Sequence, residues 1–246
     1  AVLIHTTPLL EQAGELLSHL SAARVRWVLA GLLGIDVPEI RASLSAQGVL
    51  AASGLLTIEP DPHYELKDKF NLLSSSFAYV LSESDADPMA LLRTIVLPSR
   101  PATLNLEDFT HLDQSMRAML PFLGHALATG RRGTNLLLYG PPGTGKSELS
   151  RLLARETQAE LFEVTSENEH GNPMDGERRL RAFRVAQCFL GQRRSLLLFD
   201  EVEDVFPDSS PWGGASASEN KAWINRMLED NPVPTVWVTN SVHSLD

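Results

Sequence analysis

One short stretch of the sequence combines glycines, a lysine and a serine at spacings that suit the binding of phosphate groups. Residues 140–147 read Gly-Pro-Pro-Gly-Thr-Gly-Lys-Ser and fit the pattern G-x-x-x-x-G-K-[ST]. The stretch follows an apolar run and opens into a helical pattern, which is the context such a loop needs. Glycines let backbone N–H groups turn inward around a polyphosphate, and the helix start adds partial positive charge. The sequence therefore predicts a phosphate-binding loop.

The side chains at the end of this loop have separate expected roles. Lys146 is expected to reach the β and γ phosphates of a nucleotide and so to serve both binding and catalysis, and the Ser147 hydroxyl to take one place on magnesium. The predicted nucleotide-binding residues are Gly140, Pro141, Pro142, Gly143, Thr144, Gly145, Lys146, Ser147 and Glu148.

A second motif, SLLLFDE, begins at Ser195 and ends in two carboxylates. Its apolar residues predict a buried strand that brings Asp200 to its carboxyl end, where a carboxylate can hold magnesium, usually through water. Glu201 beside it is a candidate for orienting or deprotonating an attacking water. The next two acidic residues, Glu203 and Asp204, are interpreted as a solvated loop face.

A third motif, VWVTN, is predicted to be a strand ending at Thr239 and Asn240. If this strand lies between the first two, it places a neutral amide near the terminal phosphate and the water. An amide can hydrogen-bond both without changing charge. Asn240 is therefore a third candidate for the site.

The three motifs together resemble the AAA+ superfamily of ATPases, and more narrowly its AAA branch. The resemblance covers roughly residues 104–246, with LEDFTHLDQSMRAMLPFLGHAL in place of the family's entry segment. It implies that ATP and magnesium are the cofactors, that Asp200 is the Walker B residue for magnesium, that Glu201 is the catalytic glutamate and that Asn240 is sensor 1. It also implies a five-stranded sheet and a homo-hexameric ring with nucleotide sites at subunit boundaries.

Residues 166–176 differ from the family pattern. The family's pore loop lies here and carries an aromatic residue that grips translocating polypeptide, whereas this segment reads SENEHGNPMDG. Whether the segment acts as a pore loop is left open by the sequence, and it could instead contact a specific protein partner.

The last six residues, SVHSLD, resemble the start of the family's second region of homology. We expect the sequence to be truncated inside that region, so that the arginine finger, the last strand and the lid with sensor 2 fall beyond Asp246. Arginine fingers contribute about 10³ to 10⁵ in rate, so this chain alone is expected to bind ATP and magnesium but to hydrolyse ATP weakly or not at all. Four arginines could in principle substitute for the finger but are interpreted as solvent-facing: Arg178, Arg179, Arg193 and Arg194.

The order of predicted elements indicates an α/β fold. Strands and helices alternate after residue 104, which predicts a mostly parallel P-loop NTPase sheet sandwiched by helices, without the lid. A smaller, mainly helical domain precedes it. The predicted organisation is an N-terminal domain at 1–97, a linker or entry segment at 98–110, and the ATPase core, incomplete at its C-terminus, at 111–246.

The N-terminal domain has the element order of a winged helix-turn-helix. Helical spacing is found at residues 9–20 and 22–34, Asp36 and Pro38 suit the start of another helix, and residues 55–59 read as a strand. Residues 64–81 resume helical spacing. Only one basic side chain, Arg41, lies between residues 36 and 65, which argues against DNA binding through this region.

Composition narrows the class of protein. The formal charge of −10 argues against a broad nucleic-acid interface, although a local basic patch stays possible. No apolar run is long enough to span a bilayer, and the single cysteine, Cys188, excludes an internal disulfide. We therefore expect a cytoplasmic protein without membrane contact.

Two functions are compatible with these features of the sequence. The first is Mg-dependent ATP hydrolysis that drives remodelling of a protein client, within a ring-forming AAA ATPase. The alternative is a nucleotide-dependent regulatory switch or scaffold whose N-terminal domain binds nucleic acid or a protein. The intact pair of Asp200 and Glu201 favours the enzyme, and the missing pore aromatic favours the switch.

Overall fold

The computed structural model describes residues 22–45, 48, 53–58, 70–72, 92–93, 95–167, 171–205 and 224–240. The chain divides into two compact units, an N-terminal unit of residues 1–94 and a C-terminal unit of residues 95–246. None of the described helices is both long enough and apolar enough to cross a membrane.

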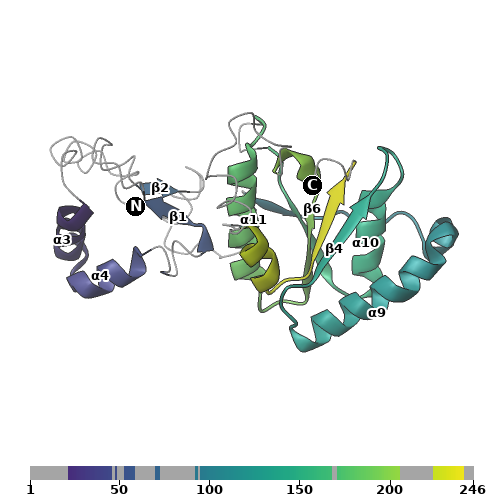
Figure 1. The fold of residues 1–246 in the computed structure, drawn as a ribbon, viewed down its shortest axis with the longest axis horizontal. Helices are drawn as coiled ribbons and strands as arrows, with labels where there is room; N and C mark the ends of the chain where they lie inside the picture. Colours follow the sequence, from purple (N-terminus) through teal and green to yellow (C-terminus); the bar gives the residue numbers. More distant parts are fainter. Residues whose placement is uncertain are drawn as a thin grey trace. The chain divides into compact units, whose positions relative to one another are not determined.

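Among its described residues, the N-terminal unit shows helices α3 and α4 and a small antiparallel sheet (Figure 1). Helix α3 (Ala22–Leu33) ends at Gly34, whose φ of 65° suits glycine, and α4 (Val37–Ser43) begins after Asp36 with a proline in its first turn. Strand β1 (Leu56–Ile58) pairs with β2 (Phe70–Leu72). The two helices and β1 confirm the sequence predictions.

The structure corrects one prediction in this unit. The helical interpretation of residues 64–81 is wrong at residues 70–72, which form β2, because pairing with β1 overrides the local spacing. The helix expected at residues 9–20 lies outside the described residues. The winged-helix interpretation stays a prediction.

The C-terminal unit alternates strands and helices along the chain. Its described elements are β3 (Val96–Pro98), η1 (Leu106–Leu112), α9 (Asp113–Thr129), β4 (Asn135–Tyr139), α10 (Lys146–Glu156), β5 (Glu160–Val164), α11 (Gly176–Leu190), β6 (Ser195–Phe199), η2 (Val202–Asp204) and β7 (Thr235–Thr239). Residues 224–230, before β7, are also helical.

Five strands form one sheet in the order β3-β5-β6-β7-β4. The last four are mutually parallel, whereas β3 runs antiparallel to β5. The unit therefore has the P-loop NTPase fold predicted from the alternating pattern. One of its five strands, β3, comes from residues that the sequence predicts to lie at the end of the N-terminal domain and in the linker. The domain boundaries stay predictions.

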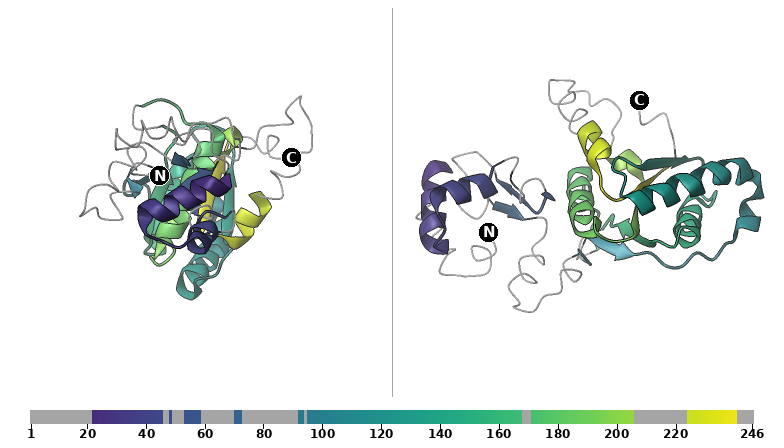
Figure 2. Two further views of the ribbon diagram at one scale, coloured as in Figure 1. Left: turned by 90° about the vertical axis from the view of Figure 1, so that its left-hand side faces the viewer. Right: turned by 90° about the horizontal axis from the view of Figure 1, so that it is seen from below.

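Helices cover both faces of this sheet (Figures 1 and 2). Leu196 and Leu198 of β6 belong to a core that also contains the apolar residues of α9 and α10. On the opposite face, Phe199 of β6 and Trp237 of β7 pack against Phe183 of α11, with ring centroids 4.9–6.1 Å apart. Because both faces are buried, β6 and β7 are apolar throughout their middle.

The strand register sets where the motifs meet. Tyr139 of β4 pairs with Thr239 of β7, and Phe199 of β6 pairs with Trp237. The residues that follow these parallel strands therefore emerge at the same edge of the sheet. In open α/β sheets this edge is where ligands bind.

Candidate nucleotide-binding site

The phosphate-binding loop connects β4 to α10. Gly143 and Gly145 have φ angles of 78° and 86°, in the left-handed region where a side chain is disfavoured. Gly145 directly precedes the first residue of α10, and a carbon added to it would lie 3.5 Å from the ring of Phe109. Phe109 comes from η1 and is buried, so the segment before α9 supports the loop. This phenylalanine belongs to the segment that stands in place of the family's entry segment, but no role is predicted for it from the sequence.

The Lys146 ammonium lies within the loop. Its Nζ donates to the carbonyl oxygens of Gly140 at 2.7 Å and Pro141 at 2.9 Å, and to Oδ1 of Asn240 at 3.1 Å. All three acceptors are uncharged. Phosphate oxygens are stronger partners for an ammonium, because charge-assisted hydrogen bonds are roughly twice as strong as neutral ones. The lysine is therefore held where a nucleotide phosphate can replace its present partners.

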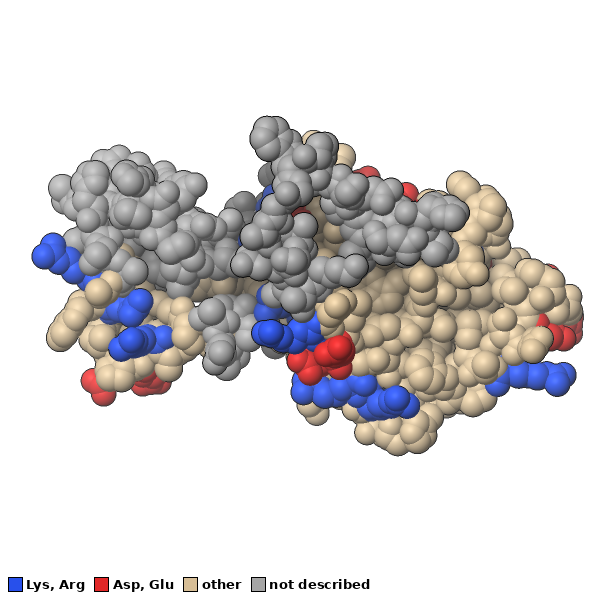
Figure 3. Space-filling model, in the orientation of Figure 1, with Lys and Arg blue, Asp and Glu red and all other residues tan. Residues whose placement is uncertain are grey.

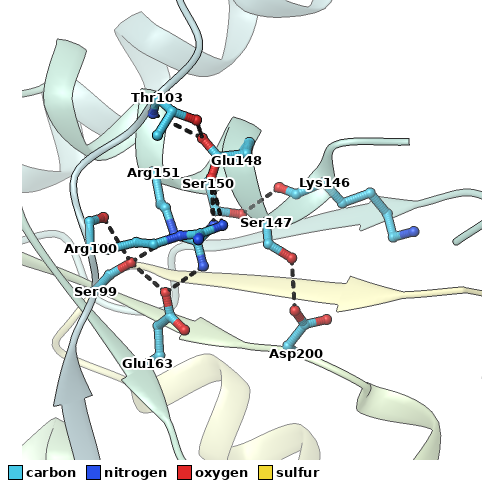
Figure 4. Close-up of polar contacts among 10 residues, drawn as sticks. All are labelled: Ser99, Arg100, Thr103, Lys146, Ser147, Glu148, Ser150, Arg151, Glu163 and Asp200. Atoms are coloured by element: carbon cyan, nitrogen blue, oxygen red, sulfur yellow. Dashed lines mark hydrogen bonds and ion pairs between the residues drawn. The ribbon is translucent and has the colours of Figure 1, made fainter. Parts of the chain in front are cut away.

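Ser147 and Asp200 face each other across the site, as Figure 4 shows. The Ser147 hydroxyl donates to Oδ2 of Asp200 at 2.8 Å, and the other carboxylate oxygen accepts the backbone N–H of Glu201 at 2.9 Å. A hydroxyl and a carboxylate are the hard oxygen ligands that magnesium prefers.

These two side chains fit a magnesium ion bound with a nucleotide. Within the described ranges, no group of three or more His, Cys, Asp or Glu side chains could hold a metal by itself. Magnesium at phosphate sites is usually held by one or two protein ligands, with water and phosphate oxygens completing its shell. The pair of Ser147 and Asp200 matches that requirement.

Glu201 has an unusual backbone. Its φ and ψ are 54° and 57°, the left-handed conformation, and its side chain is exposed. A non-glycine residue held in such a region costs about 1–3 kcal/mol, so neighbouring groups must stabilise it. The conformation turns the chain sharply after β6 and starts η2.

Asn240 lies at the end of β7 and links two charged residues. Its side-chain oxygen accepts from Lys146, and its backbone N–H donates to the carboxylate of Glu203. The interpretation of Glu203 as a solvated loop residue is therefore wrong, because the register of β6 and β7 brings η2 beside the end of β7. No local sequence signal marks this contact. The side chain of Asp204 lies outside the description.

Glu148, the last of the predicted nucleotide-binding residues, belongs to a different group of side chains. Its carboxylate accepts from the backbone N–H and hydroxyl of Thr103 at 3.0 and 2.9 Å, and from Arg151 at 2.8 Å. The Thr103 backbone hydrogen bond is the largest cause that lowers the pKa of Glu148 to about 2, with the Thr103 hydroxyl and Arg151 adding to it. The side chain therefore does not point into the phosphate loop.

Arg151 joins this group to the sheet edge. Its guanidinium donates to Glu163 of β5 and to the Ser99 hydroxyl, both at 3.0 Å, in addition to Glu148. Arg100 adds an ion pair of 3.2 Å with Glu148. We call these residues the Arg151 cluster: Ser99, Arg100, Thr103, Glu148, Arg151 and Glu163. The only local hint in the sequence is the (i, i+3) spacing of Glu148 and Arg151.

Arg179 contradicts the sequence interpretation of the four arginines. That interpretation places it in solvent, but only 1% of it is exposed. The reason is its position on α11, where it shares the buried face with Phe183 and Ala186, four and seven residues later. That spacing is a usable signal in the sequence.

The side chains of the predicted site residues thus fall into two groups, one at the phosphate loop and one, represented by Glu148, in the Arg151 cluster. Four of them, Lys146, Ser147, Asp200 and Asn240, which we call the phosphate-loop group, form two hydrogen-bonded pairs at the same edge of the sheet, Lys146 with Asn240 and Ser147 with Asp200. Glu201 follows Asp200 directly. In the segment 166–176, Glu167 and Pro173 form a β-bridge, and residues 168–170 lie outside the description.

The C-terminal unit is similar to a known family. The profile of the family described as "ATPase family associated with various cellular activities (AAA)" matches residues 136–246. Residues 136–246 thus resemble an AAA ATPase domain. The match contains the whole phosphate-loop group, as well as Glu201.

Curated relatives of this chain are much longer proteins. ATPase family gene 2 protein homolog B from Bos taurus is 37% identical over 117 residues, covering 45% of this chain and 15% of the bovine protein. The Mus musculus protein of the same name is 32% identical over 157 residues, which cover 59% of this chain and 21% of the mouse protein. Human fidgetin-like protein 1 is 33% identical over 89 residues, which cover 35% of this chain and 13% of the human protein. The chain therefore spans about a fifth or less of these relatives.

A solved structure is also similar, the AAA domain of FIGL-1 in complex with ADP. Its sequence is 18% identical and the TM-score is 0.42, with 68% of this chain and 58% of that chain covered.

Proposed function

We propose that this chain binds ATP with magnesium at the phosphate-loop group, as part of the ATPase domain of a ring-forming protein that hydrolyses ATP and remodels a protein client. The observation that carries the proposal is the convergence of Lys146, Ser147, Asp200 and Asn240 at the carboxyl ends of neighbouring parallel strands. The match of residues 136–246 to the AAA ATPase family supports the same reaction.

Each residue of the site has a role in this proposal. Backbone N–H groups of residues 140–145 and the Lys146 ammonium would hold the phosphates, and Ser147 and Asp200 would hold a magnesium ion, which would supply positive charge next to the phosphate oxygens. Glu201 accepts the proton of the attacking water, and the Asn240 amide orients that water against the terminal phosphate.

The ring and the protein client rest on family resemblance. Figure 3 shows acidic and basic side chains next to one another on the described surface of the C-terminal unit, and the net charge is −10. Such a surface favours a protein partner over a nucleic-acid backbone, which attracts clustered Lys and Arg.

One observation favours a second candidate function, that of a nucleotide-dependent switch or scaffold. Residues 166–176 contain no Phe, Tyr or Trp at the place where the family carries its pore aromatic. In that case ATP binding would order an assembly, while the N-terminal unit contacts a protein or nucleic acid.

The test measures binding and turnover separately. A fluorescent ATP analogue gives the nucleotide affinity with and without Mg²⁺, and phosphate release gives turnover over a range of protein concentrations. Lys146→Ala should weaken binding by about 100-fold or more, because it removes charge-assisted bonds to phosphate. Glu201→Gln should keep the affinity and lower turnover by about 10²- to 10⁴-fold. Arg155→Ala, which changes an exposed cation on the same helix α10, is the matched control.

Unchanged affinity in Lys146→Ala would overturn the proposed site. A specific activity that rises with protein concentration supports a site completed by a neighbouring subunit, whereas full activity at concentrations at which the protein is monomeric contradicts the ring. Weak turnover is already expected of this chain alone, so the deciding measurement uses a version extended past Asp246. Tight Mg²⁺-dependent binding by the extended version without turnover at any concentration moves the switch ahead of the enzyme.

A further inference from the structure

The guanidinium of Arg179 lies directly beneath the turn that carries Asp200 and Glu201. Arg179 is in the second turn of α11, and its guanidinium carbon sits 4.5 Å from the ring centroid of Phe199. Phe199 is the last residue of β6 and immediately precedes Asp200. A fully buried arginine is rare in proteins unless its donors are satisfied, so its surroundings show what it holds.

Two N–H groups of this arginine contact consecutive backbone carbonyls. Nη2 donates to the carbonyl oxygen of Asp200, and Nη1 donates to that of Glu201 at 3.1 Å. In an extended strand, successive carbonyls point in opposite directions, so one planar group could not bind both. The left-handed conformation of Glu201 places the two carbonyls on the same side, where the rigid fork of the guanidinium fits them.

We infer that Arg179 is a positioning residue for the site: by holding the carbonyls of Asp200 and Glu201, it keeps the turn in which the magnesium-binding and water-activating carboxylates are correctly placed. This inference rests on the proposed function, since it assigns those roles to the two carboxylates. Arg179 acts through the turn, and it ties the position of that turn to helix α11.

Arg181 offers a matched comparison on the same helix. It is also buried, with 6% exposed, but two residues along a helix correspond to a rotation of about 200°, so its side chain leaves α11 on another face. A loss of buried positive charge in general should affect both arginines. A specific hold on the turn should affect Arg179 alone.

The experiment compares Arg179→Met with Arg181→Met, and uses Arg179→Lys as a conservative second variant. The first readout is hydrogen exchange of the peptide containing residues 196–205 in nucleotide-free protein. Arg179→Met should speed exchange at residues 200–205 by about 10-fold or more, because the turn opens locally. Arg181→Met should not change exchange there relative to the rest of the unit.

The second readout is the gain in affinity for the fluorescent ATP analogue on adding Mg²⁺. Arg179→Met should reduce this gain and lower kcat, each by about 10- to 100-fold, since small displacements of positioned groups have effects of that size. Affinity without Mg²⁺ should stay within about 2-fold, because the loop and Lys146 are untouched, whereas the KM for ATP in the presence of Mg²⁺ should rise with the loss of Mg²⁺-dependent affinity. Arg179→Lys should recover part of both losses, since a single ammonium can hold one carbonyl but not both.

Unchanged exchange at residues 200–205 in Arg179→Met and Arg179→Lys would overturn the inference. Faster exchange at these residues in Arg181→Met, equal to that in Arg179→Met, would also overturn it. Equal losses of affinity with and without Mg²⁺ would reduce Arg179 to a general stabiliser of the fold and also overturn it. If the wild-type protein shows no Mg²⁺-dependent nucleotide binding, the proposed function fails by itself. The exchange readout then still decides whether Arg179 holds the turn.

Discussion

Two groups of polar side chains meet on helix α10, and neighbouring residues of its first turn belong to different ones. The Ser147 hydroxyl faces Asp200 in the phosphate-loop group, whereas the Glu148 carboxylate faces Thr103 and Arg151 in the Arg151 cluster (Figure 4). Adjacent helix positions point about 100° apart, so one turn can serve both groups.

The two groups differ in how their charges are satisfied. In the phosphate-loop group, the Lys146 ammonium contacts carbonyl and amide oxygens, and Asp200 accepts from a hydroxyl and a backbone N–H. In the Arg151 cluster, Arg151 pairs with Glu148 at 2.8 Å and Glu163 at 3.0 Å. Uncharged partners can be exchanged for a nucleotide and its metal, while opposite charges already paired have little to gain from a ligand. The difference separates a binding site from the scaffold that supports it.

Removing Arg151 tests the scaffold role and carries the largest expected effect. Its side chain is 10% exposed and holds two carboxylates, so Arg151→Met leaves both without their cation. Deleting one partner of a fully buried pair costs roughly 3–5 kcal/mol, and because Glu163 is a third exposed we expect about 2–3 kcal/mol here. Urea unfolding would measure this.

The matched control for that variant is Arg155→Met, one turn later on α10. Arg155 pairs with Glu156 in an exposed position, so the expected loss is at most about 1 kcal/mol. Nucleotide affinity of folded Arg151→Met should remain near that of wild type. A loss of affinity as large as that of Lys146→Ala would contradict the separation, because it would show that the Arg151 cluster also takes part in nucleotide binding.

Removing the Ser147 hydroxyl tests the binding role of the phosphate-loop group. It should lower nucleotide affinity and leave stability unchanged, the reverse of what is expected for Arg151→Met. Ser147→Ala should lower the Mg²⁺-dependent part of the nucleotide affinity by about 10-fold, in line with the loss of one interaction to a charged group. The free energy of unfolding should change little. Ser150→Ala serves as the control, since its buried hydroxyl bonds the Lys146 carbonyl within the helix at 3.0 Å. A Mg²⁺ effect of equal size in Ser150→Ala would argue that the helix, and not the hydroxyl, matters.

The smallest expected effect is the change with pH in the stability that Glu148 contributes to the Arg151 cluster. The pKa of Glu148 is lowered to about 2 from 4.5 in the folded protein, so its contribution to stability is present above pH 4.5 and is lost as pH falls toward 2. Glu148→Gln should therefore be less stable than wild type at pH 7, and the two proteins should converge between pH 4.5 and 2. Paired urea titrations across this range measure the convergence.

Glu160→Gln controls for the general loss of a carboxylate, because Glu160 is mostly exposed and its ion pair with Arg193 is long, at 3.8 Å. A constant stability difference between wild type and Glu148→Gln from pH 7 to pH 3 would contradict the paired state of Glu148.

Sequence reasoning succeeded where short-range pattern determines structure. The apolar run before Gly140, the glycines and the start of α10 at Lys146 are adjacent in the chain, and their geometry follows from strand, turn and helix preferences. The order of strands and helices from β4 to β7 was likewise readable, because parallel strands buried on both faces are apolar throughout.

The misses all involve partners far apart in the chain. Strand β3 exists because residues 96–98 pair with β5, and Glu203 contacts Asn240 because η2 lies beside the end of β7. Arg179 bonds a carbonyl 22 residues away. No local composition encodes which distant backbone a charged side chain will reach. Only the spacing of Arg179 with Phe183 on α11 gave a hint that it is buried.

By itself, the sequence determined the phosphate-binding loop, the acidic strand end and the α/β order of the C-terminal unit, since these depend on neighbours along the chain. Tertiary structure alone decided that Glu148 supports the scaffold while Ser147 faces Asp200, and that Arg179 holds the turn at Glu201. The physical reason is that a polar side chain takes whatever partner the packed sheet and helices bring within hydrogen-bond distance. That partner is set by strand register and helix packing.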